Sequence, residues 1–69
     1  MSFADNLNYL MEKTGTTAYR LAKSVGAHQT SVANWKNGIN MPRLEMVEKI
    51  ADYFGTSVGS LIRERKEDK

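Results

Sequence analysis

Two side-chain amides, those of Gln29 and Asn34, lie on the segment QTSVANW, which contains no acidic residue. A primary amide carries a donor and an acceptor in one plane, so it can bond bidentately to N6 and N7 of adenine. Thr30 and Ala33 lie between them and are small enough to meet a thymine methyl group. These four side chains together could read base edges by hydrogen bonding and apolar contact.

The spacing of two apolar residues indicates how these side chains are presented. Val32 and Trp35 are three residues apart, which places both on one side of a helix expected over about 29–37 and ended by Gly38. Because that apolar face is narrow, the four candidate base-reading residues are expected on the outer surface.

The preceding residues indicate a second helix that crosses this one. Ala22 is small where the two helices would meet, and Gly26 can take a positive φ at a tight turn. Val32 is branched and apolar where the following helix must face the core. This spacing is typical of a helix-turn-helix, in which the outer face of the second helix fits the major groove of DNA.

Charge is distributed unevenly along the chain. The segment from Lys13 to Leu44 has five basic residues and no acidic residue, whereas the remainder carries all eight acids and five bases. Such an asymmetry indicates one side that faces a polyanion. The basic residues of the segment are Lys13, Arg20, Lys23, Lys36 and Arg43.

Contacts to the DNA backbone are expected from polar groups that flank the base-reading face, together with the N–H groups at the helix N-termini. His28 could instead be a weak helix cap, and the sequence favours neither role. The backbone-contacting candidates are Thr17, His28, Ser31, Lys36, Asn37 and Arg43.

Helical periodicity covers most of the remaining chain and predicts an all-α fold of five short helices. We expect a single domain over residues 1–62 and a charged tail over 63–69. Leu44 and Phe54 are expected in the core, on a helix that also buries Val47, Ile50 and Ala51. Trp35 is likewise interpreted as a core residue.

Composition excludes several classes of function. With one histidine, no cysteine and no clustered carboxylates, the chain lacks groups for nucleophilic, acid–base or metal chemistry. We therefore expect no enzyme activity, cofactor or metal. No apolar run approaches the roughly 18 residues of a membrane span, so we expect no membrane partner and a cytoplasmic location.

Four segments in order, LAKSVG, QTSVANWKNG, MPRLEMVEKIADYFG and TSVGSL, make residues 17–62 resemble the Cro/CI-type helix-turn-helix family. The resemblance implies a lambda-repressor-like DNA-binding domain from a bacterial or phage-infected cell. It implies that Asn37 lies beside the DNA backbone and Arg43 near the minor groove. The chain departs from the family at Ala18, where a phosphate-contacting glutamine is common, so one backbone contact is missing.

These observations lead to the hypothesis of a sequence-specific transcriptional regulator, such as a phage or prophage repressor or a Cro-like protein. Its partner would be double-stranded operator DNA, palindromic if the protein binds as a homodimer. A dimer surface is expected around Val58, Leu61 and Ile62. An antitoxin of a toxin–antitoxin pair and a protein–protein interaction module on the same fold are the alternatives.

Overall fold

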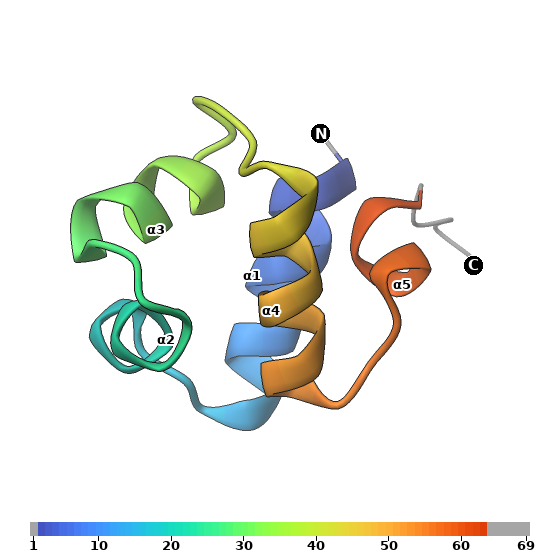
Figure 1. Cartoon of the computed structure of the whole chain (residues 1–69), viewed down its shortest axis with the longest axis horizontal. Helices are drawn as coiled ribbons and strands as arrows, with labels where there is room; N and C mark the ends of the chain where they lie inside the picture. The colour runs from blue at the N-terminus through green and yellow to red at the C-terminus, as the bar shows by residue number, and fades with distance from the viewer. Residues whose placement is uncertain (1, 64–69) are drawn as a thin grey trace.

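The structure is a computed structural model that describes residues 2–63. In this range the chain forms five helices and no strand (Figure 1), which confirms the expected all-α class. The predicted tail falls, apart from Arg63, outside the described residues. The helices are α1 (Ser2–Thr14), α2 (Ala18–Val25), α3 (Gln29–Lys36), α4 (Leu44–Phe54) and α5 (Val58–Ile62).

Local capping residues set several of the helix ends. The Oγ1 atom of Thr17 accepts a hydrogen bond from the N–H of Arg20 at 3.1 Å, which caps the start of α2. Ser57 does the same for α5 by accepting from the N–H of Ser60 at 3.2 Å. At the other end of α2, Gly26 adopts φ 76° and takes the left-handed cap conformation.

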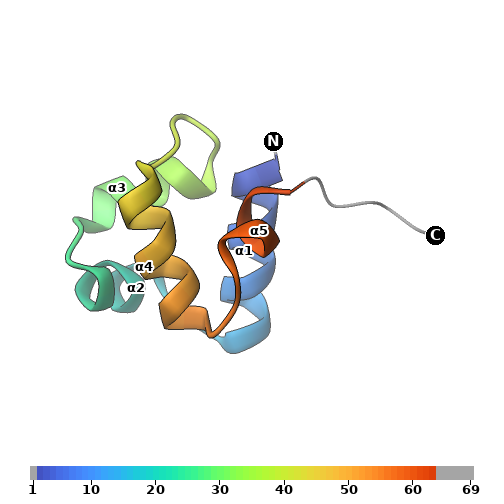
Figure 2. The same ribbon diagram turned by 45° about the vertical axis from the view of Figure 1, so that its right-hand side comes forward.

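The helices contact one another in a closed ring. α1 packs against α3 and α5, α2 packs against α3 and α4, and α4 also packs against α5. Figure 2 shows the short α5 beside α1, so the first and last helices close the ring. Each helix therefore contributes one face to a shared core and keeps the opposite face outside.

The hydrophobic core cluster receives residues from every helix. Trp35 is 6% exposed and is a core residue, as predicted. Tyr53 and Phe54 are half-buried against the core, with their rings in a T-shaped contact at 5.0 Å. The buried cluster comprises Phe3, Leu7, Met11, Leu21, Ala22, Val25, Val32, Trp35, Val47, Ile50, Ala51 and Leu61.

The prediction that Leu44 is buried is wrong. Its side chain is 63% exposed, whereas Val47, one turn later, is 1% exposed. Leu44 is the first residue of α4, directly after the exposed N-cap Arg43, so its side chain lies at the edge of the domain rather than in the core. In the described range, no helix combines the length and hydropathy needed to cross a membrane.

Candidate nucleic-acid interface

A three-residue turn joins α2 to α3 and sets their crossing. The N–H of Ala27 donates to the carbonyl of Ala22 at 2.9 Å, and Gly26 ends α2 with its positive φ. His28 then adopts an extended conformation, and α3 begins at Gln29. In Figure 1, α2 is seen nearly end-on while α3 runs across the view, so the two axes are steeply inclined. This is the arrangement that the spacing of small and apolar residues predicted.

The outer face of α3 carries the candidate base-reading side chains. Only Val32 and Trp35 of this eight-residue helix are buried. Gln29 and Thr30 are exposed, and Ala33 and Asn34 are half-buried, so none of the four lies in the core. The surface of α3 thus offers two amides, a hydroxyl and a methyl group on a short helix.

The N-terminus of α3 lacks a side-chain cap. The imidazole of His28 makes no cap hydrogen bond, in contrast to Thr17 at the start of α2. The N–H groups in the first turn of α3 are therefore without the usual side-chain acceptor, and they lie at the positive end of the helix dipole. An anionic oxygen could accept hydrogen bonds there.

The candidate backbone-contacting residues lie around α3. Thr17 and His28 are exposed at the N-cap positions of α2 and α3, while Ser31 is half-buried within α3. At the other end, Lys36 is the last residue of α3 and Asn37 is its exposed C-cap.

Arg43 is the exposed N-cap of α4 and belongs to the same region as the end of α3. It lines an open pocket together with Trp35, whose side chain is on the inner face of α3. The guanidinium group adds a cation beyond the C-terminal end of α3, although the acidic Glu45 lines the same pocket.

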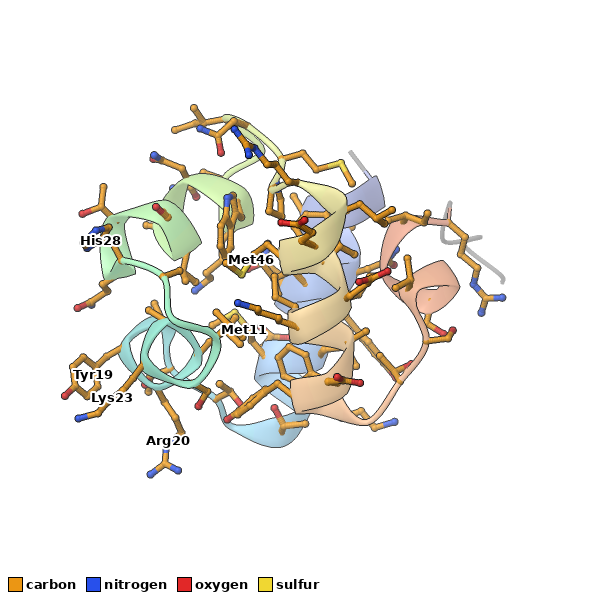
Figure 3. All side chains as sticks on the ribbon, in the orientation of Figure 1. Met11, Tyr19, Arg20, Lys23, His28 and Met46 are labelled. Atoms are coloured by element: carbon orange, nitrogen blue, oxygen red, sulfur yellow. The ribbon has the colours of Figure 1, made fainter. Side chains whose placement is uncertain are left out.

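The outer side of α2 adds further polar and cationic groups. Figure 3 shows Tyr19, Arg20 and Lys23 projecting away from the body of the domain, with His28 at the start of α3. Lys23 lies one turn after Tyr19, with its Nζ 3.5 Å from the phenolic oxygen and 5.7 Å from the ring centroid. Arg20 and Lys23 therefore add two cations on the outer side of α2.

One residue of the predicted dimer surface is not available for contact. Leu61 has no exposed side-chain surface because it faces inward from α5 and belongs to the core cluster. Val58 is half-buried, and Ile62 is 43% exposed. The surface expected from the sequence is therefore reduced to Val58 and Ile62.

Sequence reasoning missed two asparagines that hold the helices together. Asn6 and Asn8 lie on α1 and donate side-chain hydrogen bonds to backbone carbonyls of α5 and α3. Asparagine is a poor residue for a helix interior, because its amide competes for backbone partners. The presence of two asparagines in one helix with a regular apolar face was the sequence feature that could have pointed to such a role.

The turn and the outward face of α3 have the geometry of a helix-turn-helix, the motif that DNA-binding transcriptional regulators use. A model of the helix-turn-helix family matches residues 7–61. The chain therefore belongs to the helix-turn-helix family, as its resemblance to Cro/CI-type members indicated.

A solved structure supports the same assignment. The solution structure of the SOS-response transcriptional repressor LexA from Eubacterium rectale is similar, with a TM-score of 0.90 and 34% sequence identity. The match covers 99% of this chain and 72% of that chain. Comparison with curated protein sequences found no match.

Proposed function

We propose that this protein is a sequence-specific transcriptional regulator that reads operator DNA by placing α3 in the major groove. The observation that carries the proposal is that α3 gives only Val32 and Trp35 to the core. Its base-reading candidates therefore remain on the surface. The similarity to a transcriptional repressor at 34% identity supports a role of the same kind. A phage or prophage repressor, or a Cro-like protein, is the form of regulator that we propose.

Base contacts would give this regulator its specificity. The amides of Gln29 and Asn34 would bond to adenine edges, while Thr30 and Ala33 would meet thymine methyl groups. Gln29 is exposed in the first turn of α3, the part of a recognition helix whose residues contact base edges.

Phosphate contacts would supply much of the affinity and make it fall with salt concentration. Six residues within or near α3 would make these phosphate contacts through hydroxyl, imidazole, amide and cationic side chains. They are Thr17, His28, Ser31, Lys36, Asn37 and Arg43.

We also propose that the protein binds a palindromic operator as a homodimer. One eight-residue helix reads few base pairs, whereas a two-fold dimer would place two such helices about 34 Å apart, one turn of DNA. Val58 and Ile62 supply the candidate surface, with Ile62 43% exposed. Sedimentation of the protein alone and with operator tests this; a monomer in both samples would count against the dimer.

The function itself is tested by selecting binding sites from random DNA and then comparing two variants. Gln29→Ala should cost about 1–3 kcal/mol at the selected operator and relax the base preference at one position. Asn40→Ala removes an exposed amide from the loop after α3 and serves as the matched control. An unchanged ratio of operator to random-DNA affinity in Gln29→Ala would show that Gln29 does not read a base.

A further inference from the structure

The C-terminal end of α3 leaves four backbone carbonyls without partners inside the helix. Three of them accept hydrogen bonds from the residues that immediately follow. The N–H groups of Asn37, Gly38 and Ile39 donate to the carbonyls of Ala33, Trp35 and Asn34 at 3.1, 3.2 and 2.9 Å. These three bonds are local, because they join α3 only to the loop residues that directly follow it.

The fourth carbonyl, that of Lys36, is bound by another helix. It accepts a hydrogen bond from Nδ2 of Asn8 on α1 at 2.8 Å, across 28 residues of sequence. The same Nδ2 lies 2.9 Å from the carbonyl of Ala4, one turn earlier on α1. Because an amide nitrogen has two hydrogens, both donors of Asn8 have acceptors, and the plane of the amide is fixed.

This bond matters because only two side chains of α3 are buried. The side chains of Val32 and Trp35 are its two buried anchors, and two anchors define a line about which a short helix can rock. The bond to the Lys36 carbonyl adds a third attachment, at the C-terminal end of the helix, where it opposes such a rotation. A recognition helix needs such restraint, because direct base readout depends on hydrogen bonds with narrow distance and angle ranges.

We propose that Asn8 is a positioning residue for base recognition, which sets the orientation of α3 through the Lys36 carbonyl without touching DNA. This inference rests on the proposed function. Asn8 lies on α1, which belongs to neither helix of the helix-turn-helix, and its amide is half-buried. Its loss should therefore reduce discrimination between DNA sequences more than binding to DNA in general.

Asn6 provides a matched control, since it is on the same helix and uses the same chemical group. Its Nδ2 donates to the carbonyls of Leu61 and Arg63, at the end of α5 rather than α3. Loss of the Asn6 amide should therefore loosen α5 and lower stability while leaving the orientation of α3 unchanged.

The experiment measures the affinity of the full chain for its selected operator and for random DNA in three variants. Asn8→Asp keeps the shape of the side chain but removes both hydrogen-bond donors. Asn8→Ala removes the amide and introduces a residue of high helix propensity. We expect both variants to lower the ratio of operator to random-DNA affinity by about tenfold, which corresponds to the free energy of one hydrogen bond. Asn6→Ala should keep the wild-type ratio at a temperature where all variants are folded.

A second measurement needs no DNA. Backbone amide chemical shifts and hydrogen exchange of residues 33–39 should change in Asn8→Ala and stay as in the wild type in Asn6→Ala. A wild-type ratio or unchanged exchange at residues 33–39 in Asn8→Ala would overturn the positioning role. If the wild-type chain itself does not discriminate between DNA sequences, the proposed function fails instead, so the two failures are distinguishable.

Discussion

Nδ2 of Asn6 donates a hydrogen bond to the carbonyl of Leu61 at 2.6 Å, which joins the first helix to the last across 55 residues of sequence. The same nitrogen donates to the carbonyl of Arg63 at 2.8 Å. Asn6 is 2% exposed, and its Oδ1 has no hydrogen-bond partner among the residues that the structure describes. One buried amide therefore supplies both donors to the end of α5.

Asn6→Ala should lower the free energy of unfolding by about 1–3 kcal/mol, because the carbonyls of Leu61 and Arg63 lose their donor and a small cavity forms. For a domain of this size, each kcal/mol corresponds to a fall of about 4–8 °C in Tm. Urea and thermal unfolding measure both quantities. Asn40→Ala, in an exposed loop, should change stability by less than about 0.5 kcal/mol. Equal stabilities for these two variants would contradict the role of Asn6.

Thr17→Ala and Ser57→Ala should each cost about 1 kcal/mol of stability, because each hydroxyl caps a helix. Their effects on DNA binding should differ. Thr17 is the N-cap of α2, and its hydroxyl hydrogen can still donate to a phosphate while the oxygen accepts from the N–H of Arg20. Titration with operator should therefore show weaker binding for Thr17→Ala alone, and Thr17→Ser should restore it. Equal weakening in Ser57→Ala would indicate that the effect comes from stability.

Gly26→Ala should destabilise the domain by about 1–2 kcal/mol, because alanine pays a steric cost at φ 76°. An added Cβ would meet nothing within 4 Å, so the cost comes from the backbone conformation. Gly59→Ala lies within α5, at a position without a positive φ, and should instead add about 0.5–1 kcal/mol. Chemical denaturation of both variants should give opposite signs; destabilisation by Gly59→Ala would contradict this account.

Arg43→Gln should reduce the dependence of DNA binding on salt. If Arg43 contacts one phosphate, the slope of log K against log salt should become smaller in magnitude by about 1. Arg63→Gln makes the same charge change at the end of α5 and serves as the control. Binding isotherms at four or five salt concentrations give both slopes. An equal change in the two variants would mean that net charge, rather than a contact by Arg43, determines the slope.

The sequence predicted the helices well because their signals are local. Thr17, Gly26 and Ser57 act within one turn of themselves, and the structure places Thr17 and Ser57 at N-caps and Gly26 at a C-cap. The burial of Val32 and Trp35 also followed from spacing alone. Leu44 was misjudged because periodicity shows which way a side chain faces but not where along the helix the core ends.

The amides of α1 were missed because their partners are distant in sequence. Asn6 and Asn8 bond to carbonyls 55 and 28 residues away, and no local pattern encodes that pairing. The outward presentation of Gln29 was predictable, since two buried residues define the opposite side of α3. Which bases it meets depends on DNA geometry as well as on the protein, so it stays a prediction.

Because little of α3 is buried, a protein of this kind can change its DNA target during evolution. Val32 and Trp35 hold the helix, so replacements at Gln29 or Thr30 should alter target preference at little thermodynamic penalty. New binding sites could then be acquired one substitution at a time, without an intermediate that fails to fold.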